Sequence, residues 1–237
     1  MDPGTFVWVS LGSYLVGSLS FARLISRVVA PEVNVEHVAI PGQVGEETQH
    51  FSAVGATVTS LKLGGRVGCL VSILDALKIF MPTLLLRLWQ PEQPYYLCAA
   101  FSGMVGNNWP IYYRFRGGWG ISAIYGGLLA IAPVGTVVTA LIGLLVGLFV
   151  VKDLLTIYLL GLWLMIPWVW FVNRASPLLP YLLAYVVGVN LLLLIAFIPE
   201  LRAYLAMRRE GKSMADLMDL APMGRGMKKM LKMLGME

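Results

Sequence analysis

Long apolar runs separated by short polar stretches fill most of the chain between residues 6 and 198. Most of these runs reach the roughly 20 residues that a helix needs to cross a bilayer. The pattern therefore predicts an all-α, polytopic integral membrane protein. The runs cover residues 6–25, 67–88, 95–113, 121–132, 134–151, 154–172 and 178–198.

The fourth run, residues 121–132, is short, at roughly 18 Å of helix if each residue rises 1.5 Å. Pro133 follows it directly, and a proline inside a helix kinks or ends that helix. We predict seven transmembrane helices, with a short fourth one. Six helices would result if residues 121–151 formed one kinked helix.

Composition excludes an ordinary soluble domain. Hydrophobic residues make up 58% of the chain, charged residues only 13%, and the mean hydropathy is +0.75. A soluble domain carries about 25% charged residues. The first run has no basic region before it, so we expect it to stay in the membrane instead of being cleaved as a signal peptide.

Metal and cofactor binding are not expected. The two cysteines, Cys69 and Cys98, lie in apolar runs, and His37 and His50 lie in a polar loop. None of these residues has the close spacing of a metal-binding set.

Basic residues predict the orientation. With seven helices, 15 of the 18 Lys and Arg residues fall on one side of the membrane and two on the other. Basic loops stay in the cytoplasm. We therefore expect the N-terminus outside and the C-terminus in the cytoplasm, in the plasma membrane of a bacterium.

Two segments fall outside the apolar runs. Residues 31–66 form a long polar loop on the cytoplasmic side, and weak alternation over residues 33–40 suggests a short hairpin. Residues 200–237 form a tail that holds eight of the twelve methionines. We divide the chain into a membrane domain, residues 1–199, and this tail.

The end of the tail has the pattern of a basic amphipathic helix. Four apolar residues share one helical face, and most of the lysines lie elsewhere. Such a helix binds an anionic membrane surface, so the expected partner is lipid and not nucleic acid. The shared face consists of Met227, Met230, Leu231 and Leu234.

Three glycine-containing blocks follow one another along the chain. The first is Gly17-Ser18-Leu19-Ser20-Phe21. The second, "HFSAVGATVTSLKLGGRVG", begins at His50 and precedes Asp75 and Lys78. The third, "GNNWPIYYRFRGGWG", begins at Gly106. In this order the blocks resemble the patterns of the bacterial acyl-phosphate-dependent glycerol-3-phosphate acyltransferases, the PlsY family, over roughly residues 10 to 205.

This resemblance implies a seven-helix membrane enzyme of phospholipid biosynthesis. The family moves an acyl chain from acyl phosphate to glycerol 3-phosphate without a metal, at cytoplasmic loops. The family's serine falls on Phe51, one position before Ser52. The catalytic candidates of a rearranged site are therefore Ser52, Asn107 and Arg116. The phosphate- and substrate-binding candidates are Thr57, Lys62, Arg66, Arg114, Gly117, Gly118 and Gly120.

Several positions depart from the family pattern. Its loop lysine falls on Trp119, its second asparagine on Val58, its arginine on Leu61 and its histidine on Asn107. The reaction needs cations that stabilise developing negative charge. These changes imply a strongly altered site and leave it open whether the chain is an active enzyme.

Two further functions remain as alternatives. One is a non-catalytic paralogue that binds lipid, or that pairs with an active acyltransferase and regulates it. The other is a small transporter, which ranks last because the sequence shows no inverted repeat.

Two local features have a structural and a functional interpretation. Gly117, Gly118 and Gly120 either let backbone N–H groups surround a phosphate or only permit a tight turn and close helix packing. Asp75 and Lys78 lie three positions apart within an apolar run, which predicts an ion pair inside one helix. This pair is either structural or lines the site.

Overall fold

The structure is a computed structural model that describes residues 2–33, 35, 38–40, 49–51, 54–151 and 154–209. Two compact units make up the chain. Residues Met1–Ser20 and Ser72–Ala196 form the first unit, and residues Phe21–Val71 and Phe197–Glu237 form the second. Apart from one two-stranded hairpin, the regular structure of the described residues is helical, as the apolar runs predict.

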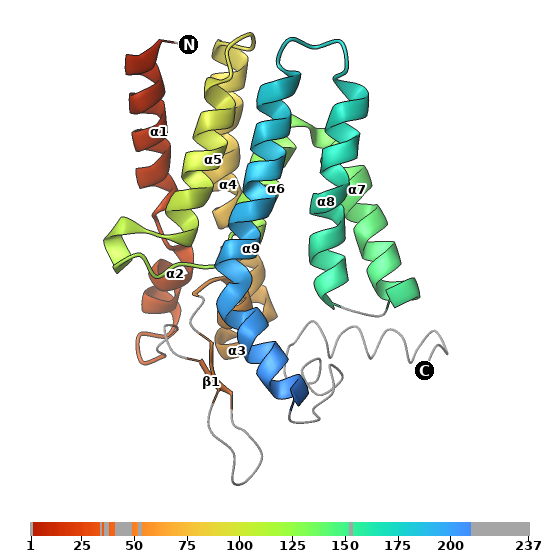
Figure 1. Cartoon of the computed structure of the whole chain (residues 1–237). Helices are drawn as coiled ribbons and strands as arrows, with labels where there is room; N and C mark the ends of the chain where they lie inside the picture. The colour runs from red at the N-terminus through yellow and green to blue at the C-terminus, as the bar shows by residue number, and fades with distance from the viewer. Residues whose placement is uncertain are drawn as a thin grey trace. The chain divides into compact units, whose positions relative to one another are not determined.

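The first unit consists of membrane-type helices. Figure 1 shows α1 beside α5, and α7 beside α8. The helices of this unit, two of which continue into the second unit, are α1 (Pro3–Gly17), α4 (Gly65–Trp89), α5 (Tyr95–Asn108), α6 (Ile121–Ile131), α7 (Pro133–Leu145), α8 (Leu154–Val172) and α9 (Leu179–Arg209).

Four helical stretches among the described residues are long and apolar enough to cross a bilayer. Two shorter apolar helices, Ile121–Ile131 and Leu159–Val172, accompany them. Together they support a protein with several membrane helices, whereas the number seven and the orientation stay predictions. The four long stretches are Pro3–Val29, Gly65–Trp89, Pro133–Val151 and Leu179–Ile198.

The first apolar run is interrupted, contrary to the single helix expected over residues 6–25. Helix α1 ends at Gly17, and α2 (Phe21–Val29) begins a separate helix in the second unit. The N–H and the Oγ of Ser18 both donate to the carbonyl oxygen of Tyr14, at 2.9 and 2.8 Å. A serine hydroxyl that binds the backbone in this way competes with the helical hydrogen bonds.

A second interruption separates α6 from α7. Ala132 has φ −142° and ψ 70°, outside the helical region, and Pro133 is the first residue of α7. The residue before a proline avoids helical backbone angles. The short fourth segment is therefore a helix of its own, and residues 121–151 do not form one continuous helix. The chain continues beyond α7 as a π-helix, η2 (Val146–Val151).

The core of the first unit joins α5, α6, α8 and α9. Met104, Ile124, Leu162 and Val186, one from each helix, are almost fully buried. Aliphatic side chains dominate this core, as is usual where helices pack closely. Trp119 packs against the core from the connection between α5 and α6.

The second unit has a small core of its own. Strand β1 (Val38–Ile40) pairs antiparallel with β2 (Gln49–Phe51), so the hairpin extends beyond the residues in which the alternation suggested it. Helix α3 (Ala56–Leu63), which the sequence did not predict, follows the hairpin. The buried residues are Ala22, Val35, Val54, Val58 and Val71.

Helix α9 crosses the predicted domain boundary. It runs from Leu179 to Arg209 without interruption, whereas the sequence suggested a division between residues 199 and 200. The amphipathic segment of the tail lies outside the described residues, so its membrane binding remains a prediction.

Candidate functional site

The connection between α5 and α6, residues 109–120, folds back onto the end of α5. The N–H of Gly118 donates to the carbonyl oxygen of Asn107 at 3.4 Å. A Cβ atom on Gly117 would collide with the carbonyl oxygens of Asn107 and Asn108. Gly117 is therefore needed for the close approach of the backbone, whether or not an anion binds there.

Gly120 is required for two reasons. Its φ is +80°, in the left-handed region that favours glycine, and a Cβ atom would collide with Oδ1 of Asn108. Gly120 also precedes the first residue of α6, and no side chain caps that helix. Helix N-termini attract anions, so the packing role and the predicted phosphate role are compatible at this position.

Two residues of the same loop have an unusual backbone. Arg114 and Phe115 have φ values of 53° and 60°, which cost a non-glycine residue about 1–3 kcal/mol each. Both side chains are exposed, and so is that of Arg116. The loop therefore presents two exposed guanidinium groups, one of them on strained backbone.

Trp119 has the opposite environment. Its side chain is half-buried and packs against the hydrophobic core of the first unit. The sequence resemblance leads us to expect a positively charged lysine at this position, whereas Trp119 contributes packing.

Helices α1 and α5 approach each other closely next to this loop. A Cβ atom on Gly17 would overlap the backbone of Gly103, and one on Gly106 would overlap the carbonyl oxygen of Tyr14. The Tyr14 hydroxyl donates to the carbonyl oxygen of Trp109 at 2.9 Å. These contacts fix the first residue of the loop to α1.

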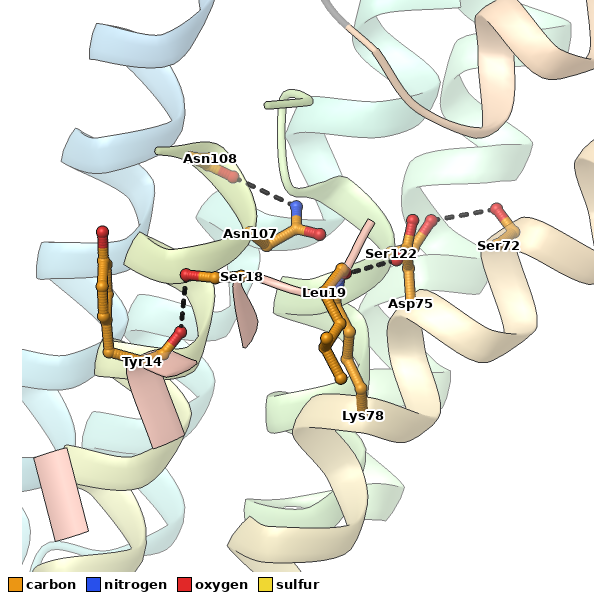
Figure 2. A network of polar contacts seen from close by, with 9 residues as sticks. All are labelled: Tyr14, Ser18, Leu19, Ser72, Asp75, Lys78, Asn107, Asn108 and Ser122. Atoms are coloured by element: carbon orange, nitrogen blue, oxygen red, sulfur yellow. Dashed lines mark hydrogen bonds and ion pairs between the residues drawn. The ribbon is translucent and has the colours of Figure 1, made fainter. Parts of the chain in front are cut away.

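The predicted ion pair within α4 is present (Figure 2). Nζ of Lys78 lies 2.7 Å from Oδ1 of Asp75, and it also donates to the carbonyl oxygen of Leu19 at 2.6 Å. Both charged side chains are buried. One turn away, the hydroxyl groups of Ser72 and Ser122 are 2.9 Å apart, which links α4 to the first turn of α6.

The remaining predicted site residues belong to the second unit or lie outside the described residues. Thr57 is exposed on the first turn of α3, Lys62 is half-buried on its last turn, and Arg66 is exposed on the first turn of α4. Ser52 is not among the described residues. The structure thus gathers Asn107, Gly117 and Gly118 and gives no test of the role of Ser52.

Sequence reasoning missed Asn108 and Tyr14. Asn108 is buried, its Oδ1 accepts from Asn107 Nδ2 at 3.3 Å, and its own Nδ2 has no hydrogen-bond partner among the described residues. The small residues Gly103 and Gly106 of one apolar run, a residue type enriched where membrane helices pack closely, were the available signal for the contact with α1. Across the described part of the chain, no cluster of three or more His, Cys, Asp or Glu residues could hold a metal.

Comparison with known protein families gives one match over most of the chain. The model of the family described as glycerol-3-phosphate acyltransferase matches residues 7–207. A glycerol-3-phosphate acyltransferase of Halalkalibacterium halodurans is 32% identical over 137 residues, which cover 56% of this chain and 60% of that protein. One from Mycoplasma pneumoniae is 28% identical over 182 residues, or 69% of this chain and 71% of that protein.

Relatives from Legionella pneumophila are 32% identical over 146 residues, and the match covers 48% of their length. The matches to several of these curated relatives thus span only about half of those proteins. Among solved structures, the crystal structure of PlsY (YgiH), an integral membrane glycerol 3-phosphate acyltransferase, in its lysophosphatidic acid form has a TM-score of 0.65. It is 22% identical and covers 86% of this chain and 93% of that one, which shows a shared fold.

Proposed function

Since the chain belongs to the glycerol-3-phosphate acyltransferase family, we propose that it transfers an acyl group from acyl phosphate to glycerol 3-phosphate through an altered, slow site. Turnover is lower than that of an unaltered relative by a factor of about 10² or more, the cost of losing one charge-stabilising donor. The observation that carries this proposal is the packing of Trp119 against the core, at the position of the family's lysine.

The proposed reaction joins the two substrates directly. A hydroxyl oxygen of glycerol 3-phosphate attacks the carbonyl carbon of acyl phosphate, and the bond from that carbon to the phosphate oxygen breaks. The hydroxyl proton is lost, and the products are lysophosphatidic acid and inorganic phosphate. Negative charge develops on the carbonyl oxygen and the leaving phosphate, so nearby cations lower the barrier.

The exposed arginines of the loop suit this task. Arg114 and Arg116 lie two positions apart on the connection that leads into α6. A guanidinium group binds phosphate through two parallel hydrogen bonds and stays charged at any physiological pH. We assign to Arg116 the binding of a substrate's phosphate, together with the N-terminus of α6. Arg114 adds positive charge near that phosphate.

A non-catalytic paralogue is the second candidate function. Val58 is buried in the core of the second unit, at the position of an asparagine in the family pattern. Together with Trp119, it supports a site in which two polar positions of the pattern serve packing. In this alternative the chain binds glycerol phosphate or lipid without turnover, or it regulates an active acyltransferase.

The membrane arrangement completes the proposal. Seven transmembrane helices, an external N-terminus and a cytoplasmic C-terminus in a bacterial plasma membrane account for the distribution of Lys and Arg. The tail of residues 200–237 binds the anionic cytoplasmic surface through its basic Met-rich helix.

The test is an acyl-transfer assay on the full chain in vesicles of anionic phospholipid. The vesicles receive acyl phosphate and labelled glycerol 3-phosphate, and lysophosphatidic acid is measured. Slow turnover that disappears in Arg116→Ala supports the enzyme. Arg174→Ala is the matched control, because Arg174 is an exposed arginine of the α8–α9 connection, outside the loop.

Two other outcomes contradict the proposal. Turnover equal to that of the Halalkalibacterium halodurans relative means that the substitutions do not slow the reaction. No turnover in a protein that is helical by circular dichroism favours the non-catalytic paralogue, and binding of labelled glycerol 3-phosphate to the vesicles then separates ligand binding from a purely regulatory role.

A further inference from the structure

A groove lies between α1, α5 and α9, at the end of the first unit where these three helices begin. Its volume is about 290 Å³. Leu97 and Tyr185 form its floor and are only 5% and 4% exposed, whereas Phe6 and Tyr181 on its rim are 42% and 52% exposed. The groove is therefore a recess in the surface of the helical bundle.

The groove residues of α1 and α9 lie within two of the stretches that are long and apolar enough to cross a bilayer, where lipid tails take the place of water. A closed apolar cavity of about 150 Å³ is already large enough to hold benzene. The groove is roughly twice as large and most of its lining residues are apolar. If the recess were empty, the side chains that line it would have no dispersion contacts on that side.

We propose that this groove binds one acyl chain of a bilayer phospholipid, at a site separate from the loop of residues 109–120. Ser10 lines the groove, and its Oγ has no hydrogen-bond partner among the described residues. A hydroxyl group that is buried without a hydrogen-bond partner destabilises the protein. The ester carbonyl at the head of a phospholipid chain is an acceptor for this hydroxyl group.

The groove and the loop lie toward opposite ends of α5. Ser102 is the groove residue of α5 nearest the loop and Asn108 ends the helix, so about 9 Å of helix separates them at 1.5 Å per residue. The ring of Phe101, which also lines the groove, packs closely against Gly188 of α9. The occupant is a lipid of the surrounding bilayer, because lipid tails surround membrane-spanning helices such as those on which the groove lies, and this inference does not rest on acyl transfer.

The test measures phospholipid that stays with the full chain after purification in a mild detergent, by native mass spectrometry. Ala184→Trp places a large ring in the groove, which Ala184 lines. Leu191→Trp is the matched control, on the same helix, 52% exposed and outside the groove. We expect wild type and Leu191→Trp to retain a phospholipid that Ala184→Trp loses.

Equal lipid retention in all three proteins would overturn the proposal. Release of the lipid by added acyl phosphate would also overturn it, because the groove would then belong to the acyl donor.

Labelling by a lipid-soluble maleimide is the second measurement and needs no variant in the groove. Added phospholipid should slow the labelling of Cys98 but not that of Cys69, which is exposed and outside the groove. Equal rates at Cys98 with and without lipid would contradict the site.

Discussion

Lys78 donates a hydrogen bond of 2.6 Å to the carbonyl oxygen of Leu19, 59 positions earlier in the chain. Leu19 lies in the non-helical segment between α1 and α2, where carbonyl groups lack helical partners. The same ammonium group also binds Asp75. Lys78 therefore balances the charge of the buried Asp75 carboxylate and donates a hydrogen bond to a backbone carbonyl group just after α1.

The Asp75–Lys78 pair predicts strong coupling between two substitutions. Lys78→Met leaves a buried carboxylate without its partner and should lower the free energy of unfolding by about 3–5 kcal/mol. Asp75→Asn combined with Lys78→Met removes both charges and should cost less than the sum of the single changes. Unfolding by a denaturing detergent in mixed micelles measures all four proteins of the cycle. If the costs of the two single changes added up to the cost of the double change, the two side chains would have no coupling energy.

Gly120 predicts a large effect from a single methyl group. Gly120→Ala meets Oδ1 of Asn108 and adopts a φ of +80°, so we expect a loss of about 1–3 kcal/mol from the backbone strain alone. Gly12→Ala is the matched control, since nothing lies within 4 Å of its added Cβ, and alanine favours a helix over glycine. Thermal unfolding in detergent compares the two, and equal melting temperatures would refute the prediction.

We expect the replacement of Trp119 by lysine to raise the activity and to lower the stability. Trp119→Lys restores the charge of the family pattern and should raise the rate of acyl transfer by about 10²–10³. It also removes packing from the core and should destabilise the fold by about 3–5 kcal/mol. Trp119→Leu should lower the melting temperature without raising the rate. If both variants give the wild-type rate, the residue at position 119 does not limit the rate of acyl transfer.

The Asp2 carboxyl should make the stability of the first turn of α1 depend on pH. The backbone N–H of Thr5 donates to Oδ2 of Asp2 at 2.6 Å and lowers the pKa of that carboxyl below 3.8. Because the folded pKa is the lower one, the stabilisation is fully present above pH 3.8 and is lost as the pH falls through the folded pKa. NMR titration of the Asp2 carboxyl in micelles should give a midpoint below 3.8. A midpoint at or above this value would exclude the cap.

The length of the apolar runs predicted several membrane helices, because each run that crosses a bilayer has to satisfy its own backbone hydrogen bonds. The Asp75–Lys78 pair followed from spacing on one helix. Pro133 marked the end of α6 because proline acts on its immediate neighbours. These features depend on residues close together in the sequence, which a pattern can describe.

Two kinds of feature were missed. The interruption at Ser18 involves residues only four positions apart, but a hydroxyl group that turns back onto Tyr14 has no counterpart in hydropathy. The close contact of Gly17 with Gly103 joins positions far apart in the sequence. In the loop, the glycines were correctly singled out, but the collision that makes Gly117 and Gly120 necessary involves Asn107 and Asn108, and it becomes visible only in three dimensions.

The contact between α1 and α5 also sets the order of events during synthesis. Tyr14 leaves the ribosome 95 residues before Trp109, whose carbonyl group binds its hydroxyl. At about 5–20 residues per second, α1 waits roughly 5 to 20 s for α5. During this interval the face of α1 that holds Tyr14 and Gly17 must be covered by lipid or by the insertion machinery. Slowed translation between the two helices would lengthen this wait, and α1 is the segment that would be exposed to wrong partners.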